Sequence, residues 1–174
     1  MLELQKSVGF IHVVLSFIFS IYFLWAPARF DLYYLVYFLL LSISWSIMKN
    51  ECAISYLFKY IGDPNYQMGD SEEVSDYNVV LGPTAGSAFL NYVLFMYVFN
   101  LVFITWRTKG VRNQLAVLLA TVSYGLYISM LRLAKKEQKD ILQTSNLVIN
   151  SILLGYFYTS DSPLSSRGLH CRRL

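Results

Sequence analysis

Three side chains with chemical potential lie in or beside apolar sequence: His12, Glu51 and Cys52. An imidazole, a carboxylate and a thiol could together serve a membrane enzyme that acts on lipid headgroups. Such chemistry needs an acid and a base within hydrogen-bond reach of one substrate. No glycine-rich phosphate loop, nucleophile elbow or zinc-protease motif accompanies these residues. The sequence therefore predicts no catalytic residues and favours a protein that is not an enzyme.

Metal and cofactor sites also lack support. The chain has two histidines, His12 and His170, and two cysteines, Cys52 and Cys171, without a paired spacing. A zinc site would need two or three more ligands near His12. A disulfide framework would need regularly spaced cysteines. We expect no metal ion and no cofactor.

Polar residues recur at intervals of three or four inside the apolar stretches, which puts them on one face of each helix. An unpaired polar group in hydrocarbon costs free energy, so these faces should meet inside a bundle. The residues expected in this polar interior are His12, Ser16, Ser20, Ser42, Ser46, Asn50, Glu51, Asn91, Thr121, Ser129 and Arg132.

The polar faces have two interpretations. Hydrogen bonds of about 0.5 to 2 kcal/mol each could simply hold the helices together, which we favour. Alternatively, they could line a path near His12 and Glu51 in a small channel or transporter. For Glu51, an ion pair with Lys49 or Arg132 is favoured over a binding or proton-handling role.

The surrounding sequence predicts the elements that must position these residues. Hydrophobic residues make up 56% of the 174 positions and charged residues 14%, against about a quarter charged in soluble domains. The expected fold is all-α, a polytopic transmembrane helix bundle of four or five spans that forms one domain over residues 1–160. The predicted spans are 8–26, 32–58, 84–106, 115–131 and 141–158, and 161–174 reads as an irregular basic tail.

The number of spans depends on the segment 141–158. Its length suffices to cross a bilayer, although it carries several polar residues. Lysines and arginines are in excess on the amino-terminal side, which predicts a cytoplasmic amino terminus. That excess persists only if 141–158 lies in the interface. We expect five spans, with four spans and an interfacial helix as the alternative.

One sizeable loop, 62–82, is rich in acidic residues and turn signals. It is the expected docking surface for a protein partner in a larger assembly, alongside the lipid bilayer. The net charge of +3 is too small to indicate nucleic acid. The residues predicted to bind the partner are Asp63, Asp70, Glu72, Glu73 and Asp76. The leading hypothesis is therefore a structural or interaction protein anchored in the membrane.

Two neighbouring motifs carry a resemblance. They are Lys49-Asn50-Glu51-Cys52-x-Ile54-Ser55-Tyr56 and Asp63-Pro64-Asn65-Tyr66-x-x-Gly69-Asp70. The block that holds them, residues 45–70, resembles a segment of small uncharacterised membrane proteins from large DNA viruses that infect algae and protists. The resemblance implies a virion-membrane or capsid-associated component, and it supplies no catalytic residues.

Overall fold

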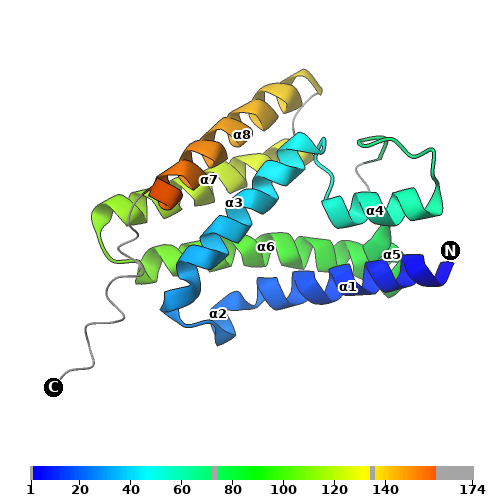
Figure 1. The fold of residues 1–174 in the computed structure, drawn as a ribbon, viewed down its shortest axis with the longest axis horizontal. Helices are drawn as coiled ribbons and strands as arrows, with labels where there is room; N and C mark the ends of the chain where they lie inside the picture. Colours follow the sequence, from blue (N-terminus) through cyan, green and yellow to red (C-terminus); the bar gives the residue numbers. More distant parts are fainter. Residues whose placement is uncertain (1, 72–73, 134–135, 160–174) are drawn as a thin grey trace. The chain divides into compact units, whose positions relative to one another are not determined.

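The computed structural model describes residues 2–71, 74–133 and 136–159 (Figure 1). Within these ranges the regular elements are all helices, which confirms the all-α prediction. The helices are α1 (Leu2–Ser20), α2 (Tyr22–Trp25), the 3-10 helix η1 (Ala28–Phe30), α3 (Asp31–Ile47), α4 (Ala53–Gly62), α5 (Ser75–Leu81), α6 (Pro83–Arg107), α7 (Val111–Leu133) and α8 (Lys136–Thr159).

Two helical stretches of the described residues are long and apolar enough to cross a membrane. They are Ala28–Ile47, which comprises η1 and α3, and α6 from Pro83 to Arg107. Their 20 and 25 residues suffice for a hydrocarbon core, which takes about 20 residues of helix. Pro83 opens α6, a position where its missing N–H costs no hydrogen bond.

The predicted continuous helix 32–58 is wrong, because α3 ends at Ile47 and α4 begins at Ala53. Lys49 and Asn50 have positive φ values of 52° and 69°, in the left-handed region that stops a helix. The N–H of Asn50 donates to the carbonyl of Trp45, five residues back, as in a Schellman helix end. The residues after Asn50 therefore do not continue the helical spacing of α3.

Two further boundaries differ from the prediction. The first helix begins at Leu2 rather than residue 8, and a turn at Ile21 divides it from α2. The loop 62–82 contains a helix of seven residues, α5, which ends at Gly82 with a φ of 86°. The predicted tail 161–174 lies outside the described residues.

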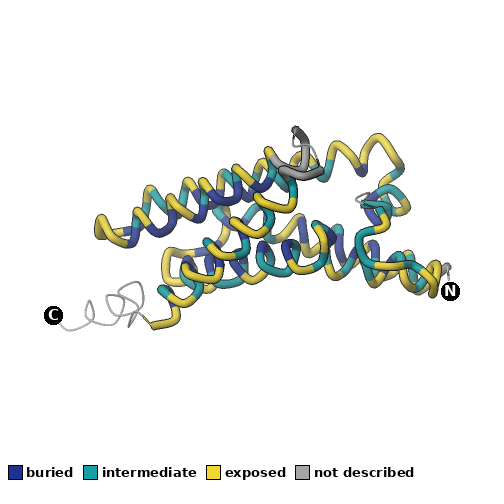
Figure 2. The backbone as a smooth tube through the Cα atoms, turned by 90° about the horizontal axis from the view of Figure 1, so that it is seen from above, coloured by how far each residue is buried: buried dark blue, intermediate teal, exposed yellow. Residues whose placement is uncertain are grey.

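The chain divides into two compact units. Unit 1 comprises residues 1–22 and 44–97, and unit 2 comprises residues 23–43 and 98–174. In unit 1, α1 packs against both α4 and α5, and in unit 2, α7 packs against α8. Figure 2 shows that these helices have a buried and an exposed side along most of their length. The exposed sides of α1 and α7 carry large apolar side chains.

In unit 2, a buried ion pair joins the start of α3 to the end of α6. Arg107 donates from Nε to Asp31 over 2.7 Å, from Nη2 to the other carboxylate oxygen, and from Nη1 to the carbonyl of Ala26 over 3.1 Å. The acid lies in the first turn of its helix and the base in the last turn, where each complements the helix dipole. This pair fixes two helix ends against each other.

Candidate functional site

The candidate site of unit 1 is assembled by three helices. His12 comes from α1, Ser55 from the first turn of α4 and Asp76 from the first turn of α5. All three side chains are buried, and Asp76 is 0% exposed. Small residues allow the helices to approach, because a Cβ on Gly9 would meet Val80 at 3.0 Å. The sequence thus places an imidazole and a carboxylate from distant segments in one interior.

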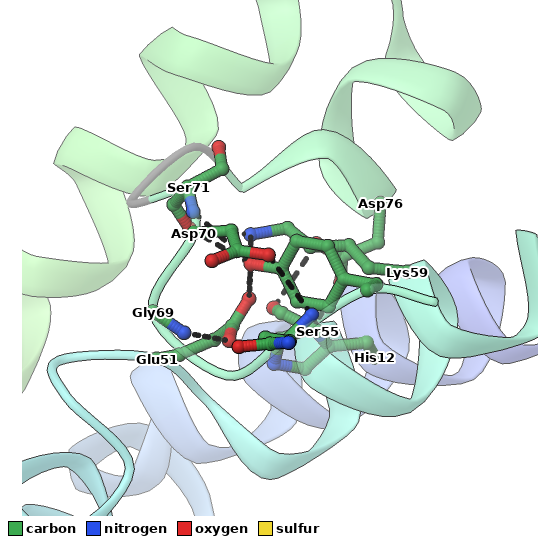
Figure 3. A network of polar contacts seen from close by, with 10 residues as sticks. His12, Glu51, Ser55, Lys59, Gly69, Asp70, Ser71 and Asp76 are labelled. Atoms are coloured by element: carbon green, nitrogen blue, oxygen red, sulfur yellow. Dashed lines mark hydrogen bonds and ion pairs between the residues drawn. The ribbon is translucent and has the colours of Figure 1, made fainter. Parts of the chain in front are cut away.

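His12 and Asp76 form the centre of this site (Figure 3). The ring nitrogen Nδ1 of His12 contacts one carboxylate oxygen of Asp76 in a short hydrogen bond. The hydroxyl of Ser55 donates to the other oxygen over 3.1 Å. A carboxylate accepts hydrogen bonds only, so Nδ1 of His12 carries a proton. The carboxylate therefore fixes the orientation and the tautomer of the imidazole, as in hydrolase triads.

The second ring nitrogen of His12 faces a thiol. Sγ of Cys52 lies 3.4 Å from Nε2 of His12, which accepts the thiol proton when Nδ1 is held by Asp76. Cys52 is half-buried and occupies the N-cap position of α4. Thiol, imidazole and carboxylate thus stand in a line.

Ser16 and Tyr77 form a second hydrogen-bonded pair beside the imidazole ring of His12. The hydroxyl oxygens of Ser16 and Tyr77 lie 2.6 Å apart, and the hydroxyl of Tyr77 lies 3.5 Å from Nε2 of His12. The two rings are tilted against each other with centroids 4.8 Å apart. Ser16 lies one turn beyond His12 on α1, so the predicted polar face of this helix does contact the interior of unit 1.

Glu51 centres a neighbouring network that holds the loop after α4. One of its carboxylate oxygens accepts from Nζ of Lys59 over 2.5 Å and from the hydroxyl of Tyr66 over 2.8 Å. The other accepts from the backbone N–H of Gly69 over 3.3 Å. Lys59 also donates to the carbonyl of Ser71 over 2.7 Å. Residues 66–71 are therefore fastened to the segment that precedes α4 (Figure 3).

Electrostatics within this network keep the ammonium charged and the phenol neutral. Burial by itself would lower the pKa of Lys59, but its hydrogen bonds and attraction to Glu51 and Tyr66 raise that pKa above the ordinary value of 10.5. Burial and the hydrogen bond to Glu51 raise the pKa of Tyr66 above 10.0, against a smaller opposing effect of Lys59. The partner of Glu51 is thus Lys59, which the sequence did not single out.

The predicted polar interior is also present in unit 2. The hydroxyl of Ser42 on α3 accepts hydrogen bonds from Asn146 over 3.2 Å and from Asn150 over 3.0 Å, both on α8. Asn146 also accepts from Ser123 of α7 over 2.7 Å. These side chains bond one another across three helices, which is the adhesive role favoured above. The channel interpretation stays a prediction.

Several predicted interior residues lie elsewhere. Asn91 and Ser129 are exposed and donate to backbone carbonyls of their own helices, so their assignment to the interior is wrong. Thr121 is half-buried and donates to the carbonyl of Val117 in its own helix. The other predicted residues are buried or half-buried, namely Ser20, Ser46 and Asn50. Arg132 lies on α7, and its side chain is outside the described residues.

Asn91, Thr121 and Ser129 lie on α6 and α7, where the spacing of polar residues does not single out one helix face. On α6 the buried polar residue is Asn100, whose side chain donates to the hydroxyl of Tyr34 over 3.0 Å and accepts from the N–H of Phe23 over 3.2 Å. On α7 the buried polar residues include Asn113 and Ser123, and Ser123 lies two residues from Thr121. Both helices carry polar residues on two sides, so spacing alone does not identify the buried one.

The acidic residues of the predicted docking loop have different positions. Asp63 and Asp70 are exposed, and each accepts a backbone N–H within its own turn, from Asn65 and Gln67 respectively, over 2.9 Å. Asp76 is buried against His12, so the prediction that it lies on the partner-facing surface is wrong. Glu72 and Glu73 lie outside the described residues.

Metal binding does not follow from the cluster around His12. Among the described residues, no three His, Cys, Asp or Glu side chains gather in a way that could hold a metal ion. Cys52 and Asp76 contact opposite nitrogens of the imidazole ring, so they do not converge on one point with it. Comparison of the chain with known protein families, curated proteins and solved structures finds no match.

Proposed function

We propose that the chain is an integral membrane protein with five helices across the bilayer, and that it acts as an interaction protein that holds a partner through residues 62–82. Two helices that suit a bilayer by length and composition support the location. Further support comes from the large exposed apolar side chains of α1, such as Phe10 and Ile11, which are 60% and 53% exposed. In lipid these side chains would face acyl chains rather than water.

The observation that carries the interaction role is the hydrogen-bond network that holds residues 66–71 of the loop in one arrangement. Glu51 and Lys59 form hydrogen bonds with Tyr66, Gly69 and Ser71. The exposed Asp63 and Asp70 each accept a backbone N–H within their own turns. Loops that a rigid scaffold holds in position carry binding residues more often than other segments do. A preordered loop also loses less conformational entropy when it binds.

The charge of the loop defines the class of partner. Asp63 and Asp70 present two exposed carboxylates, and the basic residue of the network, Lys59, is buried. The expected partner is a protein with a basic surface, and the resemblance of residues 45–70 makes a virion component the expected setting. Binding should then weaken as ionic strength rises, because salt screens exposed charges over about 10 Å at 0.1 M.

A pull-down from gentle detergent tests this role. Deleting residues 63–71, or combining Asp63→Asn with Asp70→Asn, should abolish or strongly reduce recovery of the partner. Glu3→Gln is the matched control, because it removes an exposed acid of the same unit outside the loop and should leave recovery unchanged. Unchanged recovery with the loop variants would contradict the proposal.

The location is tested separately. The protein should stay in the membrane pellet after alkaline carbonate extraction and enter solution with detergent. Reporters fused within residues 63–71 and after residue 159 should lie on opposite sides of the membrane if five helices cross, since two of the five would precede the loop. Reporters on the same side would favour four spans. Release by carbonate would overturn the membrane location.

A further inference from the structure

The line of Cys52, His12 and Asp76 has a chemical capacity that a structural role does not need. A buried serine or threonine would satisfy Nε2 of His12 as well as a thiol does, and the hydroxyl of Tyr77 already lies within 3.5 Å of it. What the thiol adds is a nucleophile whose proton has an acceptor 3.4 Å away. That acceptor is in turn oriented by a carboxylate, which is the arrangement of an activated nucleophile.

Each partner in the line has one assignable task. Nδ1 of His12 bonds Asp76, so Nε2 is the ring nitrogen that takes the proton of Cys52. The hydroxyl of Ser55 holds the second oxygen of Asp76 and prevents the carboxylate from turning. By the definition that a catalytic residue touches the reacting atoms, Cys52 and His12 are catalytic, whereas Asp76 and Ser55 position them.

The local backbone favours the thiolate form. Burial by itself would raise the pKa of Cys52, but the hydrogen bond and charge of His12 and the N–H groups of Ile54 and Ser55 lower it below the ordinary value of 9.0. These amides belong to the first turn of α4, whose N–H groups have no carbonyl partner within the helix.

We propose that Cys52 is the nucleophile of an acyl-transfer site that accepts an acyl group from a long-chain acyl thioester. The inference goes beyond the docking role proposed above and does not depend on it. Thioesters suit a thiol nucleophile, because one thioester is exchanged for another and the leaving group is itself a stable thiolate. A long acyl chain suits the helices that carry the site, because their exposed sides present large apolar side chains such as Phe10 and Ile11 on α1 and Leu57 on α4.

The step balances without another reactant. His12 takes the proton of Cys52 at Nε2, and the sulfur attacks the carbonyl carbon of the thioester to form a new carbon–sulfur bond. The tetrahedral intermediate collapses with cleavage of the donor's carbon–sulfur bond. The imidazolium returns the proton to the departing thiolate. The products are S-acylated Cys52 and the free donor thiol, and no electrons are transferred to or from an external partner.

The first experiment measures whether the thiol is activated. In a Cys171→Ser background, the rate of alkylation by iodoacetamide is followed against pH in detergent. With His12 and Asp76 in place, the midpoint of the rate profile should lie below pH 9. Asp76→Asn should shift this profile upward and lower the rate at neutral pH about tenfold, which is the effect of one pKa unit on the thiolate fraction. Cys52→Ser should abolish labelling, and Tyr66→Phe is the control outside the line.

The second experiment tests the substrate class. Alkyne-tagged palmitoyl-coenzyme A should label Cys52, the label should be removed by neutral hydroxylamine, and acetyl-coenzyme A should label it poorly. Asp76→Asn, checked for folding by circular dichroism, should slow labelling at neutral pH, and its labelling rate should recover at higher pH. If the carboxylate of Asp76 had only a structural role, raising the pH would not restore the rate. A pH profile of alkylation that is unchanged in Asp76→Asn would overturn the activated thiol. Rapid alkylation without acylation would overturn the acyl thioester as substrate.

Discussion

The guanidinium of Arg107 holds the carboxylate of Asp31 with two parallel hydrogen bonds, and their side chains are only 15% and 2% exposed. Removal of one partner from such a buried pair leaves an uncompensated charge, at a cost of about 3 to 5 kcal/mol. Arg107→Ala should therefore lower the free energy of unfolding by that amount. Arg107→Lys should cost less, because it keeps the charge but loses the planar fork. Denaturant titration in detergent, followed by circular dichroism, measures both.

A double substitution gives the control for this pair. When Asp31→Leu is combined with Arg107→Met, no charge is left unpaired, and apolar side chains can occupy the site. The double variant should be more stable than Arg107→Ala alone. If the double variant lost as much free energy of unfolding as Arg107→Ala, or more, the contribution of Asp31 and Arg107 would not arise from their pairing.

The cluster of Ser42, Ser123 and Asn146 predicts a measurable adhesive effect in unit 2. Asn146→Leu removes the side chain that bonds both α3 and α7, and should destabilise the protein by about 1 to 2 kcal/mol. Ser129→Ala is the matched control on α7, because that hydroxyl is exposed and bonds only its own helix. Its effect should stay within about 0.5 kcal/mol. Similar effects of both substitutions in a denaturant titration would contradict the assignment.

The Glu51 network predicts stability that is lost at high pH. The folded-state pKa values of Lys59 and Tyr66 both lie above their ordinary values of 10.5 and 10.0. Groups with raised pKa values contribute fully below the unfolded-state value and lose that contribution as pH rises through the folded-state value. The loop should therefore keep its structure from neutral pH to about pH 10 and loosen above it.

Phenolate absorbance measures this behaviour. The titration difference between the protein and its Tyr66→Phe variant isolates one tyrosine, which should ionise later than an exposed one. Lys59→Met should lower the resistance of residues 66–71 to proteolysis at neutral pH, because the ammonium that bonds Glu51 and Ser71 is removed. Ionisation of Tyr66 at or below its ordinary pKa would contradict the network.

Gly69 should tolerate substitution poorly. Its φ of +87° is unfavourable for other residues, and a Cβ would lie 2.7 Å from Cδ of Lys49 and 2.9 Å from its Cβ. Gly69→Ala should therefore destabilise the loop by about 1 to 3 kcal/mol. Gly125→Ala is the matched control, because the added methyl meets nothing within 4 Å on α7 and should stabilise that helix by about 0.5 to 1 kcal/mol. Thermal unfolding of the two variants should shift in opposite directions.

The periodic part of this architecture could be predicted from the sequence. His12 and Ser16 share a face because four residues make about one helical turn, and both reach the interior of unit 1. Ser42 and Ser46 share a face of α3 for the same reason, both are buried, and Ser42 bonds Asn146 of α8. Local periodicity is a property of the helix itself and needs no knowledge of its neighbours.

Partners from distant segments could not be predicted in the same way. Asp76 sits in an acidic, turn-rich stretch, which indicates exposure, whereas its burial depends on His12 and Ser55 from two other helices. The sequence identifies Cys52 as a residue with chemical potential, but its distance to His12 depends on the helix end at Lys49 and Asn50. No local propensity reveals such a distance, because it is set by the packing of α1 against α4.

The left-handed turn at Lys49 and Asn50 also has a consequence for how this protein can vary. Because this turn separates α3 from α4, the spacing of about 3.6 residues per turn in α3 does not decide which way Glu51 and Cys52 face. Substitutions that change the pattern of polar and apolar residues in α3 therefore leave the local geometry of the reactive segment unaltered.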